Sequence, residues 1–285
     1  MDSDETRVSE ETRGDGVKAA AVSRHLRYRA GEWEQTTGQV IVETPISLTV
    51  NGQVWLSLMC TPVDLPALAV GFLFNERVIN GIAEIESLRV CPQMENIDIW
   101  LSHPVEKPPS WTRTSGCSGG ATSVSAIMQG QNISRNGGAV CPADISRLMA
   151  EFSHRQTLYR QTGGVHTSAL SDGNQIVMVA EDIGRHNTLD KLSGRCLAES
   201  IHLARRIILT TGRVSSEMLQ KAARMSAAII ISRTSPSSRS IEMAETLGIT
   251  LIGYARHDAF TVYTHPERIQ SVPELKTQEE DGYDE

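Results

Sequence analysis

The stretch IILTTGRVSSEMLQKAARMSAAIIIS, residues 207–232, holds two apolar runs on either side of an amphipathic segment. The runs at 207–211 and 228–232 are continuous rather than alternating, which is typical of strands buried on both faces of a parallel sheet. The segment 216–226 between them has the pattern of a helix. The order strand, helix, strand predicts an α/β fold whose mostly parallel sheet is covered by helices on both faces.

The same alternation continues on both sides of this stretch. Turn residues at 171–174 predict a hairpin, because Asp-Gly between two apolar runs favours a tight turn. One α/β domain is therefore predicted over residues 111–270. Its further elements are a helix at 144–159, a strand at 176–180, helices at 185–192 and 241–247, and a strand at 250–254.

A smaller unit precedes this domain. Two alternating runs, 40–50 and 53–59, flank Asn51-Gly52, which is the strongest short-range signal of a hairpin. A helix is predicted next, with Thr61 as its N-cap and Pro62 as its first residue. Two short strands follow, at 85–90 and 97–101.

These elements predict a small α+β domain over residues 38–110, which ends in a proline-rich linker at 103–109. Residues 1–37 are polar and are predicted to be a disordered tail. Residues 271–285 are predicted to be an acidic tail. The two ends account for the whole negative net charge of −7, since 1–17 and 271–285 together hold twelve acids and three bases, and the rest of the chain is slightly positive.

Composition excludes several classes of protein. With 40% hydrophobic and 21% charged residues among 285, the chain is an ordinary globular protein. It has no apolar run long enough to span a membrane and no secretory signal, so we expect it in the cytoplasm. The part between the two ends is nearly neutral, which argues against a nucleic-acid-binding surface. Five cysteines without a CxxC pair argue against a disulfide framework and a structural zinc site, and no metal site is predicted.

Four polar clusters follow or precede the predicted strands, at 162–166, 181–191, 210–217 and 232–238. Ligands of open α/β sheets bind where the strands end, and helix starts rich in hydroxyls and arginine suit a phosphate. The candidate ligand residues are His166, Arg185, His186, Arg213 and Ser215. The alternative is structural: Ser215 caps its helix, Arg213 pairs at the surface, and 181–191 is a salt-bridged surface helix.

Cys117 lies in the glycine- and serine-rich segment Arg113-Thr-Ser-Gly-Cys-Ser-Gly-Gly120. A sulfur-carrying thiol must be reached by two large partners in turn, which an accessible loop permits, and Arg113 favours the thiolate. The alternative is a thiol that has no chemical role. Structural roles are predicted for the other four cysteines.

Taken in order, six groups of residues between 40 and 268 resemble the formate dehydrogenase accessory sulfurtransferase family. Each is weak alone, and the ordered set is specific. They are Thr61-Pro-Val-Asp-Leu with Leu68-Ala-Val-Gly-Phe-Leu and Glu76, Thr114-Ser-Gly-Cys117, Thr162-Gly-Gly-Val-His166, Glu181-Asp-Ile-Gly-Arg-His186 with Leu189-Asp-Lys-Leu192, Arg213-Val-Ser-Ser-Glu-Met218, and Val262-Tyr-Thr-His-Pro266.

The resemblance implies a function and a fold. Such proteins accept sulfur from a cysteine desulfurase as a cysteine persulfide and pass it to a bis-molybdopterin guanine dinucleotide molybdenum cofactor destined for formate dehydrogenase. Cys117 matches the persulfide cysteine. The implied fold is a homodimer whose subunit joins a cytidine-deaminase-like three-layer α/β domain to a smaller N-terminal α+β domain. The cofactor-binding loop, placed after the last strand, maps onto Tyr254, Ala255, Arg256, His257, Asp258 and Ala259.

Two positions depart from the family pattern, and two other functions stay open. Gly120 stands where some members have a second cysteine, and His257-Asp258-Ala259 replaces a stretch that often has glycine and a second base. One rival is a chaperone that binds the guanylylated cofactor without moving sulfur. The other is a nucleotide-processing hydrolase, against which the missing H-x-E and P-C-x-x-C zinc signature argues.

Overall fold

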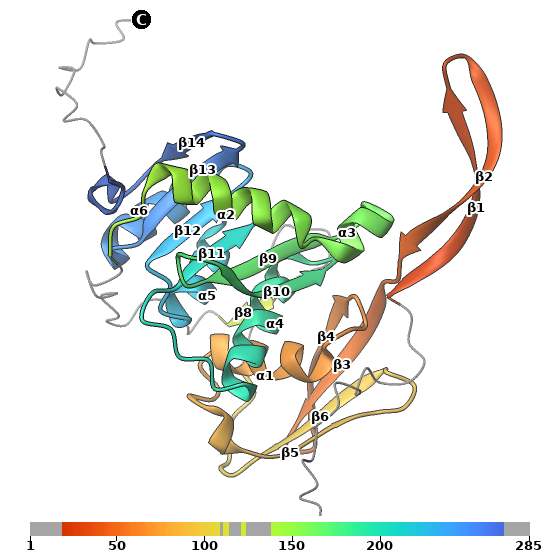
Figure 1. Ribbon diagram of the computed structural model, residues 1–285. Helices are drawn as coiled ribbons and strands as arrows, with labels where there is room; N and C mark the ends of the chain where they lie inside the picture. Colours follow the sequence, from red (N-terminus) through yellow and green to blue (C-terminus); the bar gives the residue numbers. More distant parts are fainter. Residues whose placement is uncertain (1–18, 109–110, 114–120, 124–137, 271–285) are drawn as a thin grey trace, which may run out of the picture.

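The computed structural model describes residues 19–108, 111–113, 121–123 and 138–270. It shows a larger α/β lobe, a smaller lobe beneath it and a long two-stranded ribbon that extends away from both (Figure 1). Buried apolar residues form two clusters, one drawn from residues 46–101 and one from residues 140–269. The exact domain limits stay a prediction.

The larger lobe is built on a six-stranded sheet with the order β10-β9-β11-β12-β13-β14. Only the neighbours β11–β12 and β12–β13 pair parallel, whereas the pairs β10–β9, β9–β11 and β13–β14 are antiparallel. The expected mostly parallel sheet is therefore wrong: two hairpins, β9–β10 and β13–β14, flank a parallel centre. The strands are β9 (His166–Ser171), β10 (Ile176–Asp182), β11 (Ile207–Thr210), β12 (Ile229–Ser232), β13 (Thr250–Arg256) and β14 (Ala259–Val262).

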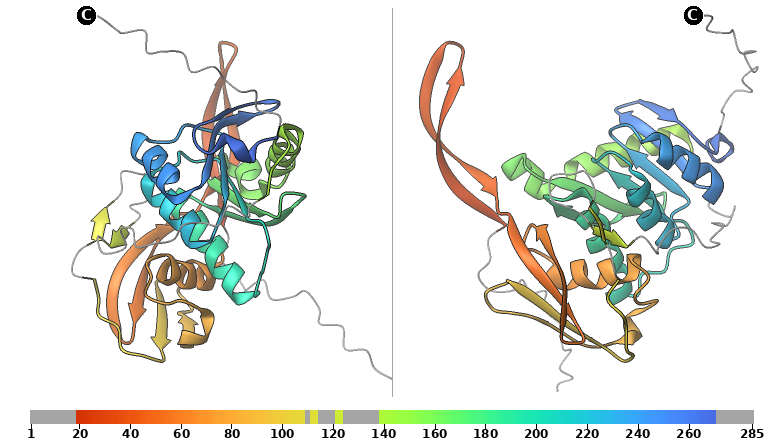
Figure 2. Two further views of the ribbon diagram at one scale, coloured as in Figure 1. Left: turned by 90° about the vertical axis from the view of Figure 1, so that its left-hand side faces the viewer. Right: turned by 180° about the vertical axis from the view of Figure 1, so that it is seen from behind.

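Helices cover both faces of this sheet, so the lobe has three layers (Figure 2). One face carries α2 (Pro142–His154), which buries Ile145, Leu148, Met149 and Phe152. The short helix α3 (Thr157–Thr162) follows α2. The other face carries α4 (Arg185–Ala198), α5 (Ser216–Arg224) and α6 (Ser238–Leu247). The mixed α/β class is confirmed, and the finer cytidine-deaminase-like assignment stays a prediction.

The smaller lobe packs α1 (Leu65–Asn75) against a four-stranded sheet with the order β4-β3-β6-β5. The predicted hairpin is confirmed, with Asn51 at φ 48° and Gly52 at φ 77° in the turn. The helix begins later than predicted, at Leu65, because Thr61 is used in contacts with the other lobe. The strands are β3 (Thr44–Val50), β4 (Gln53–Cys60), β5 (Ile85–Val90) and β6 (Asn96–Leu101).

The two lobes meet where α1 crosses α4, and two glycines allow the close approach. A Cβ on Gly71 would lie 1.7 Å from the carbonyl oxygen of Asp190, and one on Gly194 would lie 2.0 Å from that of Ala67. Only glycine lets the two backbones pack at this distance. The crossing therefore fixes the smaller lobe against α4.

The predicted disordered tail over 1–37 is wrong for residues 20–37. These residues belong to β1 (Ala20–Arg29) and β2 (Glu32–Ile41), which pair over their whole length as the ribbon of Figure 1. Most side chains of the ribbon are exposed, and they include the apolar Val22, Leu26, Tyr28 and Trp33. Two further strands were not predicted, β7 (Trp111–Arg113) and β8 (Ala121–Ser123), and they pair with each other. In the described ranges, no helix combines the length and apolar character that a membrane span requires.

Candidate functional site

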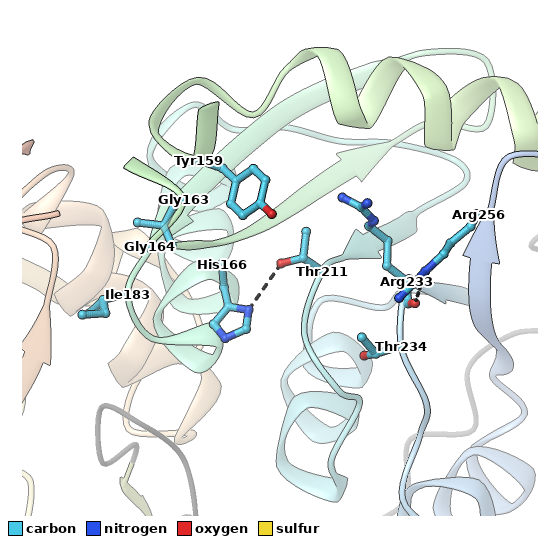
Figure 3. A pocket seen from close by; sticks show the side chains of 10 residues that line it. Tyr159, Gly163, Gly164, His166, Ile183, Thr211, Arg233, Thr234 and Arg256 are labelled. Carbon is cyan, nitrogen blue, oxygen red and sulfur yellow. Dashed lines mark hydrogen bonds between the residues drawn. The ribbon is translucent and has the colours of Figure 1, made fainter. Parts of the chain in front are cut away.

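A pocket of about 470 Å³ opens at the edge of the larger sheet where β11, β12 and β13 end (Figure 3). The antiparallel β9 begins at the same edge, which brings the segment before it to the pocket. We call this cavity the strand-end pocket. Its lining residues are Tyr159, Gly163, Gly164, Val165, His166, Ile183, Thr211, Arg233, Thr234 and Arg256.

The charged groups of the strand-end pocket are cationic. Arg233 follows β12 and Arg256 ends β13, and Nε of Arg256 donates to the carbonyl oxygen of Arg233 at 3.3 Å. This bond holds the Arg256 side chain against the backbone of Arg233, and both arginines line the pocket (Figure 3). No carboxylate is among the lining residues. Two guanidinium groups in one pocket, without a carboxylate partner among the described residues, suit a phosphate or diphosphate ligand.

His166 lies in the wall of the pocket, and its Nδ1 is 3.3 Å from Oγ1 of Thr211. That hydroxyl also accepts a hydrogen bond from the backbone N–H of Thr167 at 3.0 Å, which holds Thr211 in place. Burial lowers the pKa of His166, and the nearby Arg185 guanidinium lowers it further. The imidazole is therefore neutral at pH 7, so its ring nitrogens serve as a hydrogen-bond donor and acceptor rather than as a charge.

Two of the predicted residues flank the glycine turn after β11 without lining the pocket. Arg213 is exposed, and Ser215 accepts a hydrogen bond at 3.3 Å from the backbone N–H of Met218. The structural alternative for Ser215, a helix cap, is thus confirmed. Arg185 approaches the turn closely, since a Cβ on Gly212 would lie 3.0 Å from the Arg185 Cβ.

His186 is buried beneath this edge and takes no part in lining the pocket. Its Nε2 lies 3.3 Å from a carboxylate oxygen of Glu217 and 3.4 Å from the hydroxyl of Ser215. Burial lowers the pKa of His186 to about 2, assisted by the positive charges of Lys221 and Arg185. A neutral, buried imidazole of this kind connects α4 to α5 and is not a phosphate ligand.

Much of the charged cluster at 181–191 is buried, so it is not the salt-bridged surface helix of the structural alternative. The Asp182 carboxylate accepts from the backbone N–H groups of Thr61 and Gly184, from the Asn187 amide and from the Lys191 ammonium. All of these groups lie inside the protein, at the junction of the two lobes. The signal that suggested a ligand therefore marks a buried structural network.

Glu181 has a separate structural role. Its carboxylate accepts hydrogen bonds from the backbone N–H groups of Leu158 at 2.8 Å and Tyr159 at 3.0 Å. These N–H groups belong to the first turn of α3, so Glu181 caps that helix from β10. The contact holds Tyr159 at the mouth of the strand-end pocket.

The segment 254–259 is not a loop after the last strand. Residues Tyr254–Arg256 end β13, and Ala259 begins β14, so only His257 and Asp258 form the turn of a hairpin. Ala255 is 1% exposed and packs in the core. Of the six predicted residues, only Arg256 lines the pocket.

Cys117 lies outside the described residues, between β7 and β8, and its role stays a prediction. The remaining cysteines include two buried thiols, Cys60 and Cys196. Burial raises the pKa of Cys60 to about 12 and raises that of Cys196 as well, so both are inert at neutral pH. In the described part of the chain, no group of three or more potential metal-ligating side chains is present.

Sequence reasoning missed several residues of the pocket. Thr211, Arg233 and Thr234 lie within two of the polar clusters, yet they were not chosen as ligands. The available signal was their place, one or two residues after an apolar strand. Tyr159 had no such signal, because α3 reaches the pocket through tertiary packing.

Comparisons with known proteins bear on the whole chain. The model of the FdhD/NarQ family matches residues 41–270. The chain is 34% identical over 258 residues to "Sulfur carrier protein FdhD" of Bacillus subtilis (strain 168), covering 89% of this chain and 98% of that protein. It is 35% identical over 259 residues, with the same coverage, to the protein of that name from Bacillus licheniformis.

A solved structure supports the same family assignment. The crystal structure of a protein described as a formate dehydrogenase accessory protein, from Desulfotalea psychrophila, matches with a TM-score of 0.76 and 30% identity. The match covers 88% of this chain and 100% of that one. Since the family model spans far more than half of the chain and relatives above 30% identity match over nearly their full length, this protein is a member of the FdhD/NarQ family.

Proposed function

We propose that this protein is a sulfur carrier for formate dehydrogenase, in which Cys117 takes sulfur from a cysteine desulfurase in the cytoplasm. The acceptor is the molybdenum of a bis-molybdopterin guanine dinucleotide cofactor, which the strand-end pocket binds as substrate. Family membership supports the sulfur-carrier role, since full-length relatives bear that name. Among the described residues, the observation that carries the ligand class is the pair Arg233 and Arg256 in a pocket without a carboxylate.

The pocket fits one nucleotide end of such a ligand. Its volume of about 470 Å³ lies within the range of about 300–1,000 Å³ that small-molecule sites span. The two guanidinium groups match a diphosphate, and Thr211, Thr234 and the neutral His166 supply uncharged hydrogen-bonding groups. Exposed Arg213 and Arg239 add positive charge near the same edge, while the exposed Asp258 subtracts from it.

The first chemical step is thiol exchange at sulfur. The Cys117 thiolate attacks the outer sulfur of the desulfurase persulfide, a new S–S bond forms at Cys117, and the desulfurase cysteine leaves as a thiolate. No net oxidation occurs in this step, because the transferred sulfur keeps its oxidation level. Its delivery as sulfide consumes two electrons, which a thiol reductant supplies.

Peptide mass spectrometry tests the carrier step. The full chain is incubated with a cysteine desulfurase and cysteine, and the wild type is compared with Cys117→Ala. Cys91→Ala is the matched control, because Cys91 is the partly exposed thiol at the β5–β6 turn. We expect one added sulfur on the Cys117 peptide in the wild type and in Cys91→Ala, and none in Cys117→Ala.

A second candidate is a chaperone that binds the cofactor without moving sulfur, and the same pocket supports it. The two functions predict different behaviour of Cys117→Ala, a substitution that alters none of the described residues lining the pocket. If Cys117→Ala binds guanosine diphosphate as the wild type does but fails to restore formate dehydrogenase activity to cells that lack the protein, the carrier is supported. Full restoration by Cys117→Ala would establish the chaperone instead.

A further inference from the structure

A second cavity, of about 340 Å³, lies at the junction of the two lobes, and we call it the junction cavity. One wall comes from the end of α1 and the turn after it, and the other comes from the second half of α4 and the segment that leads to β11. Most of the lining is apolar, and it includes Phe74 and Ile82 of the smaller lobe and Leu197, Ile201 and Met225 of the larger one. An apolar hollow of this size with a few polar groups is typical of a small-molecule site.

The junction cavity is separate from the strand-end pocket, and no described residue lines both. Arg206 lines the junction cavity and directly precedes β11, whereas the strand-end pocket lies where β11 ends. The four residues of β11, at about 3.3 Å each, set these two edges of the sheet on the order of 13 Å apart. A ligand of the junction cavity is therefore distinct from the nucleotide proposed above.

The guanidinium of Arg206 is held in the wall of the junction cavity by two backbone carbonyls. Its Nη1 donates to the carbonyl oxygen of Met225 at 2.8 Å, and its Nη2 donates to that of Ile201 at 3.0 Å. Both acceptor residues also line the cavity. The remaining N–H groups of the guanidinium are available to a ligand, and its position is fixed before the ligand arrives.

The positive charge of Arg206 has no acidic partner in the part of the chain that the structure describes. The lining includes no carboxylate, and Glu199, the acid nearest in sequence, is paired with Arg195 at 3.0 Å. The charge of Arg206 acts inside the cavity: burial raises the pKa of the Cys196 thiol, which is part of the lining, and the guanidinium opposes this rise. A fixed guanidinium beside apolar walls favours a carboxylate, which can accept two hydrogen bonds from it.

We propose that the junction cavity binds a small carboxylic acid with an apolar body, such as a medium-chain fatty acid. The carboxylate pairs with Arg206, and the apolar part lies against Phe74 and Leu197. At the packing density of a protein interior, about 340 Å³ accommodates roughly ten to fifteen non-hydrogen atoms. A single guanidinium among apolar side chains suits one carboxylate and offers nothing to a second charge. Because the walls come from both lobes, the ligand also stabilises their junction.

Methyl NMR of the full chain, with labelled methionine and octanoate as the probe, tests the proposal. Octanoate should shift the Met225 signal saturably, with a dissociation constant of about 1 mM or lower. Met178, which is buried in the core of the larger lobe outside the lining, should not shift. Octylammonium has the same chain length and the opposite charge, and it should bind at least about 10-fold more weakly.

Two substitutions locate the ligand. Ala83 lines the cavity and is exposed, so Ala83→Trp fills the hollow and should weaken octanoate binding by about 10-fold or more. Ala198→Trp is the matched control, because Ala198 is an exposed alanine of α4 outside the lining, and it should bind as the wild type does. Arg206→Gln removes the charge, and octanoate should then lose its advantage over octylammonium. The other methionine signals report whether each variant keeps the fold.

Three results would overturn the proposal. Octanoate that leaves the Met225 signal in place, or that binds Ala83→Trp as tightly as Ala198→Trp, occupies some other part of the protein. Equal affinities of the wild type for octanoate and octylammonium would show that Arg206 selects no anion. Neither sulfur nor nucleotide enters these measurements, so their outcome is independent of the proposed function.

Discussion

The ammonium of Lys191 lies 2.7 Å from the carboxylate of Asp182, and neither side chain is exposed to solvent. The ammonium also donates to the carbonyl oxygen of Thr61 at 3.0 Å, so the pair joins the larger lobe to the start of the segment that leads into α1. Both residues belong to the family-specific run 181–192. Their contacts hold the two lobes together.

Removing one member of this pair should destabilise the protein strongly. In Lys191→Met, Asp182 keeps its buried charge and loses its counter-ion, which costs about 3–5 kcal/mol of unfolding free energy. Urea denaturation measures the loss. The exposed pair of Arg195 and Glu199 provides the control, since Glu199→Gln should cost less than about 0.5 kcal/mol. A Lys191→Met protein as stable as Glu199→Gln would contradict the buried pair.

The close crossing of α1 and α4 should make the unfolding free energy sensitive to any side chain added at Gly194. Alanine at Gly194 places a Cβ 2.0 Å from the Ala67 carbonyl oxygen, which the backbone of α1 can relieve only by moving away. We expect Gly194→Ala to lower the unfolding free energy by about 3 kcal/mol or more, as overpacking against backbone does. Gly81→Ala is the control, because a Cβ there has nothing within 4 Å. Similar unfolding midpoints for the two variants would show that the helices are farther apart.

The parts of the fold that could be predicted from the sequence are those that a short stretch of residues specifies by itself. Asn51-Gly52 specifies its turn through local conformational preference, and the apolar runs around 207–232 specify buried strands through their own composition. Gly71 and Gly194 carry no such signal, because their requirement comes from a helix more than a hundred residues away. The ribbon was missed for a related reason: its charged and apolar residues alternate between two faces, but no layer formed by the described residues covers either face.

Residues of the site could be predicted where they lie directly before or after a strand that the sequence itself indicates. The predicted polar clusters before β9 and after β11 and β12 contribute residues to the pocket, and His166, chosen from the first of them, does line it. Arg256 lines it too, but that residue was expected from the family resemblance and not from its place at a strand end. Reasoning from strand ends also placed the whole cluster 181–191 at a ligand site, although Asp182 and Lys191 within it are buried, because a sequence does not distinguish a charge at the surface from one buried against another lobe. Their burial depends on Thr61, some 120 residues earlier.

Acid should destabilise the protein through His186. The folded-state pKa of His186 is about 2, below the unfolded value near 6.5, so below about pH 6.5 the unfolded chain binds a proton that the folded protein does not. The contribution is thus complete above pH 6.5 and is lost as the pH falls, by about 1.4 kcal/mol per pH unit. His186→Gln should flatten the pH dependence of unfolding between about pH 6 and pH 5 by roughly this amount. His202→Gln, at an exposed position, is the control, and an unchanged slope in His186→Gln would refute the buried neutral imidazole.

The two arginines of the strand-end pocket should contribute directly to the binding of an anionic nucleotide. Each of Arg233 and Arg256 offers a charge-assisted hydrogen bond to a diphosphate, and loss of one such bond to a charged partner costs about 1.5–3 kcal/mol. Arg233→Ala and Arg256→Ala should therefore weaken binding of guanosine diphosphate by about 10- to 100-fold in isothermal titration calorimetry. Arg239→Ala removes an equal charge from the first turn of α6, outside the lining, and should change the affinity less than about threefold at physiological salt, where exposed charges are screened. If all three variants lose affinity equally, the charge of the whole edge rather than this pocket attracts the nucleotide.

The double variant tests whether the two arginines act together. Because Arg256 donates to the carbonyl oxygen of Arg233, Arg256→Ala also frees the Arg233 backbone, and the double variant should lose less affinity than the two single losses combined.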